Sequence, residues 1–291
     1  MATRPRLAVT LGDPRGIGPE VVSKALARPL DADVTIVGKG EGGRGKEEEG
    51  AVPSEEEAGR IAAAAITEAV RLALAGDVDA IVTAPVNKQA LHLAGFRYPG
   101  VTELLSHLAG DVPVAMMLAT GALRVVLVTT HLPLRDVPRM VTTERIVETG
   151  RIAVRALGRW WGIASPRLAV CALNPHAGEG GLFGDEDRTV LEPAARALGA
   201  VGPVPADTVF VRALKGEFDA VLTPYHDVGM TAVKVAGFGT GVNVTLGLPF
   251  LRTAPDHGTA LDIAGQGIAD PGSMRAALEL AAQLASRQPS A

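Results

Sequence analysis

Four of the six histidines stand in short polar segments that each follow a predicted strand. They are His131, His176, His226 and His257. The other two, His92 and His107, fall in helical patterns, which favours packing or surface roles. Neutral imidazoles bind zinc and related divalent ions, and three protein ligands leave one position open for a substrate. The four loop histidines therefore indicate a catalytic metal site, with an ordinary structural role as the alternative for each one alone.

A second group of residues is typical of a loop that binds an anionic ligand. The segment GDPRGIGPE, residues 12–20, follows a predicted strand and opens a predicted helix. Glycines let the backbone approach a ligand, and a helix N-terminus offers free N–H groups to an anion. A tight turn that needs glycine is the alternative. The segment lacks the G-x-G-x-x-G spacing, so it does not indicate a standard Rossmann site.

Two further segments carry polar side chains at predicted strand ends. TAPVNK, residues 83–88, could line a site, or Asn87 or Thr83 could simply cap a helix. Lys234, Asn243 and Arg252 lie in or beside a glycine-rich stretch at residues 237–251. Two cations and an amide near a strand end suit a phosphate or carboxylate. The alternative is that these side chains lie on a loop and contact only solvent.

The elements that must position these residues alternate between strands and helices. Apolar runs predict strands at 6–11, 33–37, 80–83, 112–118, 124–129, 167–171 and 220–223. Helical patterns cover 17–27, 55–75, 143–160, 186–198, 206–214 and 274–285. Most of the strands are apolar throughout, which indicates burial on both faces. An α/β protein with a largely parallel core is therefore expected, with its ligands at the carboxyl ends of the strands.

Composition narrows the function classes. Of 291 residues, 47% are hydrophobic and 21% charged, and the net charge is −4, which favours neither nucleic acid nor an anionic membrane surface. Cys171 is the single cysteine, so no intrachain disulfide forms. No signal peptide or membrane span is evident, and a cytoplasmic protein is expected. The Gly- and Glu-rich segment 38–57 is expected to be a mobile surface loop.

Taken together, the motifs resemble a known family, the 4-hydroxythreonine-4-phosphate dehydrogenases of vitamin B6 biosynthesis. The segments that carry the resemblance run through almost the whole chain: 12–20, 83–88, 129–138, 173–181, 202–208, 225–230, 234–253 and 256–267. Two of them, GDPRGIGPE and HGTALDIAGQG, are also similar to segments of isopropylmalate and isocitrate dehydrogenases.

The resemblance implies a fold of two α/β domains with a cleft, like isocitrate and isopropylmalate dehydrogenases. Residues 1–128 with 246–291 would form the cofactor-side domain, and residues 129–245 the metal, substrate and dimerisation domain. It also implies a homodimer with active sites at the subunit interface, a small phosphorylated substrate, and no nucleic acid or membrane partner.

The resemblance also implies roles for individual residues. One divalent ion per site, zinc, magnesium or cobalt, would be held by His131, His176 and His226. The substrate would contact Thr102, Lys234, Asn243 and Arg252. By analogy with the related dehydrogenases, NAD or NADP would be held by Gly12, Asp13, Gly16, Gly18, His257, Gly258 and Asp270.

The reaction that the resemblance implies is the oxidation of 4-phosphooxy-L-threonine. The product is a 2-amino-3-oxo acid that loses carbon dioxide to give 3-amino-2-oxopropyl phosphate. The metal would act as a Lewis acid, and the nicotinamide would accept the hydride. Lys234 and Asp227 are the candidates for the general base.

One position departs from the family pattern. The family usually has a histidine that touches the substrate in a His-Thr-Glu segment, and this chain has Val101 before Thr102. Valine cannot donate a hydrogen bond, and a lost contact of this kind costs roughly 1–3 kcal/mol. A paralogue that acts on a phosphorylated threonate or erythronate, or on a dihydrodiol carboxylate, is therefore one alternative. More distant alternatives are a phosphate acyltransferase and a catalytically inactive binding protein.

Overall fold

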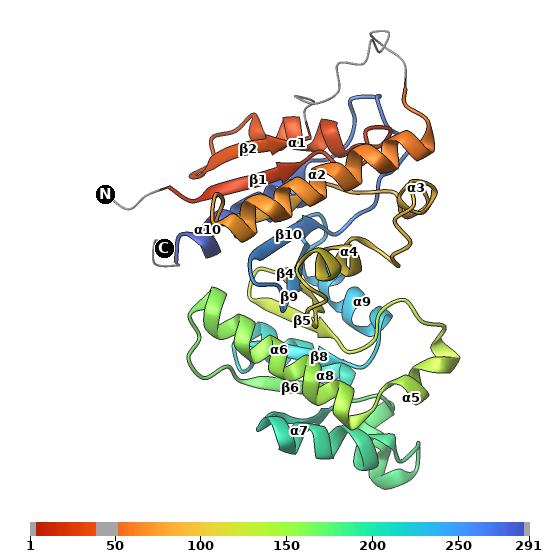
Figure 1. Cartoon of the computed structure of the whole chain (residues 1–291). Coiled ribbons are helices and arrows are strands. Elements are labelled where there is room, and N and C mark those ends of the chain that lie inside the picture. The colour runs from red at the N-terminus through yellow and green to blue at the C-terminus, as the bar shows by residue number, and fades with distance from the viewer. Residues whose placement is uncertain (1–3, 39–51, 288–291) are drawn as a thin grey trace. The chain divides into compact units, whose positions relative to one another are not determined.

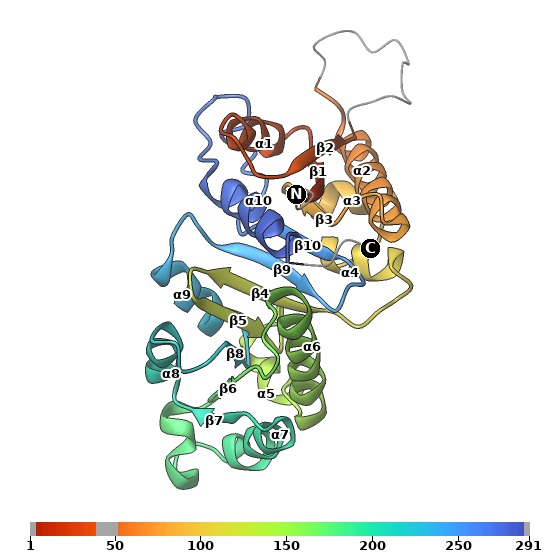
Figure 2. The same cartoon turned by 90° about the vertical axis from the view of Figure 1, so that its left-hand side faces the viewer.

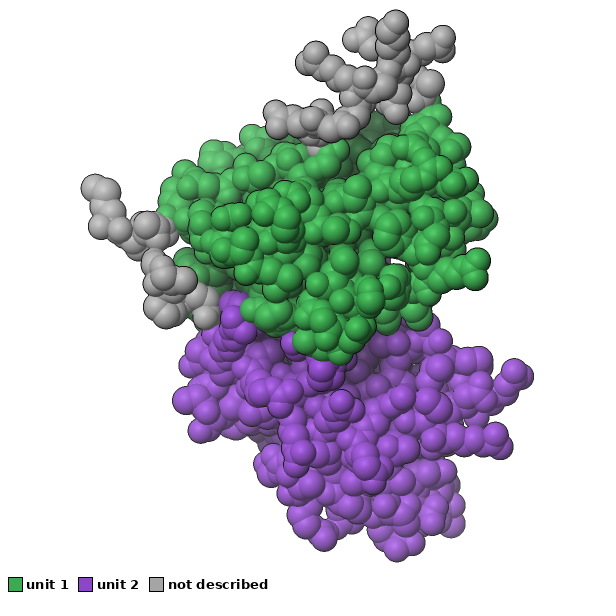
Figure 3. Space-filling view, in the orientation of Figure 1, with its two compact units in different colours: residues 1–112, 248–291 green, residues 113–247 purple. Residues whose placement is uncertain are grey.

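The computed structural model describes residues 4–38 and 52–287. The chain divides into two compact units, which Figure 3 colours separately. Unit 1 comprises Met1–Val112 with Leu248–Ala291, and unit 2 comprises Pro113–Gly247. The chain therefore leaves unit 1 once, builds unit 2 and returns to complete unit 1.

The strands of unit 1 that the structure describes are all parallel (Figure 1). Their spatial order is β2 (Asp33–Val37), β1 (Arg6–Thr10), β3 (Ala80–Thr83) and β10 (Leu251–Pro255). Helices cover both faces of this sheet: α1 (Gly18–Leu26) and α10 (Gly272–Ala285) lie on one side, and α2 (Glu55–Ala75) and α3 (Lys88–Leu93) on the other (Figure 2). The inner strands are almost wholly buried, as their continuous apolar sequences require.

Local sequence explains where α2 begins and ends. The Ser54 hydroxyl accepts a hydrogen bond from the backbone N–H of Glu57 at the first turn, and Gly76 closes the helix in the left-handed conformation. Between these ends, Gly59 permits close packing on α3, since a Cβ at this position would overlap the carbonyl oxygen of Ala90. The remaining helix of unit 1 is α4 (Val101–Leu108).

Unit 2 has a mixed sheet. In spatial order its described strands are β9 (Val242–Leu246), β4 (Ala115–Thr120), β5 (Leu123–Leu127), β8 (Ala220–Thr223), β6 (Leu168–Cys171) and β7 (Val201–Val204). β4 is antiparallel to both β5 and β9, whereas β5, β8, β6 and β7 are parallel. The parallel strands present their carboxyl ends at one edge, where ligand residues are expected.

Helices also cover both faces of the unit 2 sheet (Figure 2). On one side lie α8 (Ala206–Leu214) and α9 (His226–Ala236), and on the other α6 (Thr143–Trp161), with α7 (Glu192–Leu198) packed against it. The shorter elements are η1 (Leu134–Asp136), α5 (Val137–Met140), η2 (Pro175–Gly181) and the π-helical turn η3 (Asp187–Leu191). The Thr142 hydroxyl caps α6 by accepting the N–H of Arg145.

The same Arg–Asp arrangement joins the amino ends of two neighbouring parallel strands in each unit. In unit 1 the pair is Arg6, the first residue of β1, and Asp79, just before β3. The Arg6 backbone N–H donates to the Asp79 carboxylate (2.7 Å), and the Asp79 N–H donates to the Arg6 carbonyl (2.7 Å). The two side chains also form an ion pair at 2.8 Å. Arg167 and Asp219 repeat this before β6 and β8. Burial opposes ionisation of both aspartates, but the arginine hydrogen bonds outweigh it and hold the pKa of Asp79 and Asp219 below the ordinary value.

The predicted α/β fold class is confirmed, and the helices predicted at 55–75 and 206–214 have those bounds. The structure adds β7, β9 and β10, which the sequence patterns did not predict. The first boundary between the units falls at 112/113, earlier than the expected 128/129, because β4 and β5 pair with β9 and β8 of unit 2. Most of the predicted loop 38–57 lies outside the described residues.

None of the described helices combines the length and apolar composition that a membrane crossing requires.

Candidate active site

Two of the predicted ligand histidines lie together in unit 2. His131 follows β5, and His226, expected in a loop, is instead the first residue of α9, just after β8. These strands are parallel neighbours, and the Thr129 hydroxyl donates to the Pro224 carbonyl (2.7 Å), which joins the two segments beyond them. The centres of the two imidazole rings are 5.5 Å apart. A hollow of about 130 Å³ is lined by both histidines, together with Thr130, Leu132, Leu134, Val137, Tyr225 and Asp227.

A carboxylate orients one ring of this pair. The Nδ1–H of His226 donates to Oδ1 of Asp227, at 2.7 Å. This bond leaves Nε2 of His226 as the nitrogen that can carry a metal. A metal-binding histidine almost always donates its other ring N–H to a carboxylate or carbonyl in this way. These two rings can therefore supply part of the ligand set of the divalent ion that the sequence predicts.

The third predicted ligand, His176, lies on an unusual turn after β6. Residues 176–181 all have positive φ, and three of them, His176, Ala177 and Glu179, are not glycine. Left-handed backbone costs roughly 1–2 kcal/mol for each non-glycine residue, so the surrounding structure must hold this turn. Among the described residues of one chain, no three His, Cys, Asp or Glu side chains are grouped closely enough to hold a metal.

Two predicted substrate residues also belong to unit 2. Lys234 is in the last turn of α9, and its Cα is roughly 12 Å along the helix from that of His226. Asn243 is on β9, and its side-chain Oδ1 is buried with no hydrogen-bond partner among the described atoms. A buried acceptor without a partner is uncommon in proteins and is consistent with a ligand that supplies a donor.

The predicted cofactor loops come together in unit 1. The backbone N–H of Ile17 donates to the carbonyl of Thr259 (2.9 Å), and a Cβ at Gly16 would lie 2.9 Å from that of Thr259. Gly12 has φ +72°, and a Cβ there would overlap the Pro85 carbonyl oxygen. The segments that contain Gly12, Asp13, Gly16 and Gly18 on one side and His257 and Gly258 on the other are thus in direct contact.

The second predicted cofactor loop runs from His257 to Asp270. Hydrogen bonds join its C-terminal part to α1. Lys24 Nζ donates to the carbonyls of Gly267 and Ala269, and Glu20 accepts the Ala269 N–H. Asp270 accepts the N–H of Gly272 at the start of α10. His257 Nε2 is buried and has no partner among the described atoms, so it is a further polar group that a bound ligand would satisfy.

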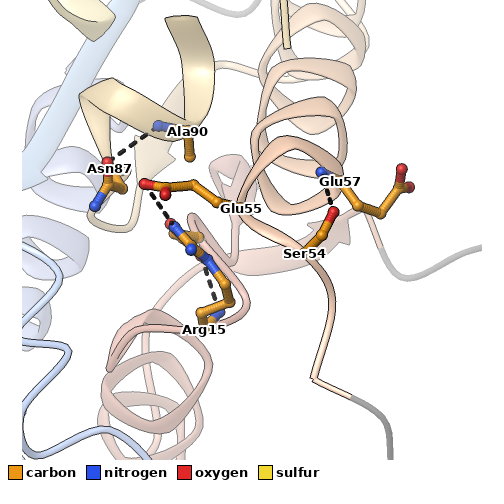
Figure 4. Close-up of polar contacts among 7 residues, drawn as sticks. Arg15, Ser54, Glu55, Glu57, Asn87 and Ala90 are labelled. Atoms are coloured by element: carbon orange, nitrogen blue, oxygen red, sulfur yellow. Dashed lines mark hydrogen bonds and ion pairs between the residues drawn. The ribbon is translucent and has the colours of Figure 1, made fainter. Parts of the chain in front are cut away.

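A buried carboxylate organises the first cofactor loop. Asp13 is fully buried, and Arg15 pairs with it at 3.0 Å and with Glu55, the first residue of α2, at 3.6 Å. Figure 4 shows Arg15 reaching from the loop towards this first turn of α2. The same view shows Asn87 accepting the N–H of Ala90, so Asn87 is a helix cap, the simpler of its two predicted roles.

The other predicted substrate residues of unit 1 are Arg252 and Thr102. Arg252 is on β10 and only 4% exposed, and its Nε and Nη2 donate to the hydroxyl of Thr83, at 3.1 and 2.5 Å. Burial lowers the pKa of Arg252 to about 10, so the group is still a cation at neutral pH. Thr102 is in the first turn of α4, directly after Val101, and both are half-buried.

Comparison with known proteins identifies the family. The model of the family described as pyridoxal phosphate biosynthetic protein PdxA matches residues 33–281. The chain belongs to the PdxA family. A member from Geobacter metallireducens, named 4-hydroxythreonine-4-phosphate dehydrogenase, is 44% identical over 97% of this chain and 96% of its own length. Another, the D-threonate 4-phosphate dehydrogenase of Salmonella typhimurium, is 42% identical over 96% and 98%.

Solved structures agree with this assignment. The 4-hydroxythreonine-4-phosphate dehydrogenase of Klebsiella pneumoniae superimposes with a TM-score of 0.89, at 40% identity over 98% of this chain and 99% of the other. A beta-decarboxylating dehydrogenase from Thermococcus kodakarensis, at 18% identity, has a TM-score of 0.52 over 96% and 81% of the two chains. That likeness concerns the fold alone.

The sequence did not indicate how two residues beside the site act. Thr83 was one of the residues that could line a site or cap a helix, and in the structure its hydroxyl accepts two hydrogen bonds from Arg252. Asp187 had no motif to mark it, yet it is buried and accepts the N–H groups of Leu173 and Asn174, just before His176. The only signal in the sequence was an acidic residue soon after the NPHAGEGG segment.

Proposed function

We propose that this member of the PdxA family oxidises 4-phosphooxy-L-threonine with NAD or NADP, in a reaction that requires a divalent metal ion. The keto acid formed then loses carbon dioxide to give 3-amino-2-oxopropyl phosphate. The observation that carries the proposal is the pair His131 and His226, with Asp227 orienting the second ring, in a chain of this family. We infer a place in pyridoxal phosphate biosynthesis from the same match.

In this proposal the histidines hold the ion and the neighbouring residues handle protons. When bound, a divalent ion supplies Lewis-acid stabilisation of the negative charge that develops on the substrate oxygen. Asp227 is already the hydrogen-bond partner of His226, which favours Lys234 over Asp227 as the group that takes the hydroxyl proton. Zinc, cobalt and magnesium are all candidates, although imidazole ligands favour the first two.

The substrate's charged groups are assigned to the cations and to the amide. The buried guanidinium of Arg252 would bind the phosphate or carboxylate with little competition from water. Thr102 would donate its hydroxyl or backbone N–H to the same ligand, and Asn243 would use its buried Oδ1 to accept a hydrogen bond from it. NAD or NADP, which supplies the hydride acceptor, would lie on the contacting loops that include Gly12, Gly16 and His257.

We also propose that the active site is completed by a second copy of the chain. His131 and His226 of one protomer would take their third ligand, His176, from its partner, because one chain does not group three ligands among its described residues. An apolar groove of about 580 Å³ between α8 and α9 lies beside the site and shares Tyr225 and Asp227 with it. A second copy of the chain is the occupant that this groove would bury.

The test is cofactor reduction with 4-phosphooxy-L-threonine, with and without a chelator. Turnover should be abolished by the chelator and restored by added metal. His226→Ala should lower turnover at least 100-fold, whereas His92→Ala, at a ring that bonds the Tyr98 carbonyl within unit 1, should retain it. Near-normal turnover of His226→Ala, after removal and readdition of metal, would show that the ligand assignment is wrong.

A second candidate function is favoured by Val101 and by one relative. The Salmonella typhimurium relative is named for D-threonate 4-phosphate, which has a hydroxyl where 4-phosphooxy-L-threonine has an amine. Valine in place of the usual histidine removes one polar contact near Thr102. If the metal-loaded protein reduces the cofactor with a phosphorylated threonate or erythronate and not with 4-phosphooxy-L-threonine, this candidate replaces the first.

A further inference from the structure

The segment that carries His176 is fixed at its start by a buried carboxylate. Asp187, 1% exposed, accepts the backbone N–H groups of Leu173 (2.8 Å) and Asn174 (2.9 Å). These are the first N–H groups beyond the β6 ladder, which ends where the Ala172 N–H donates to Val204. Burial, and then the negative charge of Asp187, raise the pKa of the nearby Cys171 thiol to about 12.

The turn itself does not explain why His176 is held where it is. Its φ angles at His176, Ala177 and Glu179 are +53°, +56° and +44°, a region that side chains other than glycine rarely adopt. Such backbone persists only when its surroundings determine it, and it concentrates at functional positions. Some other part of the fold must therefore select this conformation.

The contacts that close the turn lead back to the segment containing Asp187. Gly178 packs on this segment, since a Cβ there would lie 2.8 Å from the Gly184 carbonyl and 3.8 Å from Asp187. The Asn174 side-chain amide donates to Glu186 at 2.8 Å. Asp187 is also the first residue of η3, a π-helical turn, and such turns are frequent at functional sites.

We propose that Asp187 is a positioning residue that holds the left-handed turn, and with it the imidazole of His176, in the geometry that binds the metal. The inference rests on the proposed function, in which His176 is a metal ligand. Asp187 does not touch the ion. It acts by fixing the backbone N–H groups of Leu173 and Asn174, which precede His176 in the chain. Loss of Asp187 should therefore make the position of the His176 imidazole less fixed and weaken metal binding, while the imidazole itself remains.

A matched control separates this role from ordinary stabilisation. Asp219 also accepts the backbone N–H of a residue next to β6, that of Arg167, but at the opposite end of the strand. Asp187→Asn and Asp219→Asn each remove one negative charge and keep the side-chain shape. Both should lower the unfolding temperature of the metal-free protein, but only the first should change metal affinity.

The experiment is titration of the metal-free protein with cobalt(II), followed by the visible absorption of the bound ion. Asp187→Asn should raise the Kd about 10- to 100-fold, the usual effect of losing a group that supports a ligand. Asp219→Asn should remain within about twofold of the parent. In His176→Ala, the added Asp187→Asn change should have little further effect, because both act through the same ligand.

The outcomes distinguish this inference from the proposed function. If His176→Ala weakens cobalt binding and folded Asp187→Asn does not, the positioning role is overturned and the ligand assignment stands. If His176→Ala binds cobalt normally, the assignment of His176 fails and this inference fails with it. Should Asp187→Asn not fold, Asp187→Glu keeps the charge but displaces the carboxylate from the N–H groups of Leu173 and Asn174, and it should weaken cobalt binding severalfold. An unchanged Kd in that variant would overturn the inference.

Discussion

Arg252 has the features that its proposed role in binding an anion requires. Its side chain on β10 is buried, and two of its guanidinium nitrogens donate to one hydroxyl, that of Thr83. Desolvation lowers the pKa of Arg252 to about 10, which leaves it charged at neutral pH. A phosphate or carboxylate that meets this fixed cation gains a strong interaction, because neither group has to be reoriented.

We predict that Thr83→Val raises the KM for the phosphorylated substrate about tenfold, with a smaller effect on kcat. Valine keeps the shape of threonine but cannot accept the two Arg252 hydrogen bonds, so the guanidinium loses its fixed orientation. Steady-state kinetics at saturating cofactor measure the effect. Thr253→Val is the control: it breaks a bond to the Ala277 carbonyl of α10 and should leave KM unchanged. Equal KM values in all three proteins would contradict the role of Thr83.

At the residue scale, sequence indicated candidate ligand residues more readily than the residues that hold them. One histidine in a polar loop has an ordinary structural explanation, but four in equivalent loops stand out. His131 and His226 were singled out on that basis, and the structure places their rings 5.5 Å apart. The contact of Thr83 with Arg252 was not predicted, and Asp187 was missed altogether, because threonine and aspartate are common at turns. The role of Thr83 depends on Arg252, which is distant in sequence. The role of Asp187 depends on Asn174, which lies at the start of an irregular turn.

At the scale of elements, prediction succeeded where the pattern was strong and local. Helix α2 has a serine cap, acidic residues in its first turn and a closing glycine, and its bounds were predicted correctly. Helix α9 and strands β9 and β10 were missed. They lie in or directly beside the glycine-rich stretch 237–251, where glycine weakens both helix and strand signals. One of these glycines, Gly247, has φ +95°, and a Cβ there would overlap the Pro113 carbonyl, a requirement that only the fold reveals.

The Arg–Asp pairs at the amino ends of the strands should make stability depend on pH. The pKa of Asp79 is held below its ordinary value of 3.8, so its contribution is present above that value and is lost as pH falls through the lower, folded pKa. We predict that Asp79→Asn lowers the free energy of unfolding by about 1 kcal/mol at pH 7, a modest figure because the pair is partly exposed. The difference should shrink as pH falls below about 4.

Urea unfolding at pH 7, 4 and 3 measures this difference. Asp31→Asn, which disrupts a highly exposed pair with Arg4, is the control and should change little at any of these pH values. A difference between Asp79→Asn and the parent that is the same at every pH would contradict the explanation, since it would show that the charge of Asp79 does not matter.

At the scale of the whole molecule, the proposed homodimer accounts for an apolar surface on unit 2. The groove between α8 and α9 includes Val211, Leu214 and Val235, which are 51%, 48% and 83% exposed in the single chain. Exposed apolar side chains gathered in this way are typical of a surface that binds a partner. Burial of the groove would place a second copy next to Tyr225 and Asp227, beside the histidine pair.

We predict that Leu214→Glu shifts the protein from dimer to monomer and lowers both turnover and cobalt affinity. A charge in an apolar interface must be desolvated without a partner, which weakens association strongly. Sedimentation velocity at several concentrations measures the assembly. Leu74→Glu, at a similarly exposed leucine of α2 in unit 1, should remain dimeric. A monomeric parent protein with full activity would rule out the shared site.

The positions of the Arg–Asp pairs have a consequence for how this enzyme can adapt. In unit 1 they join the starts of β1 and β3, strands that end at the Gly12 loop and at Thr83; in unit 2 they join the starts of β6 and β8, which lead to His176 and His226. Four or five residues of strand, roughly 15 Å, separate the two ends. Substitutions at the amino ends of these strands can therefore change heat or acid tolerance without altering the proposed ligand residues at the carboxyl ends. Directed evolution for greater stability should accumulate tolerated substitutions at the amino ends.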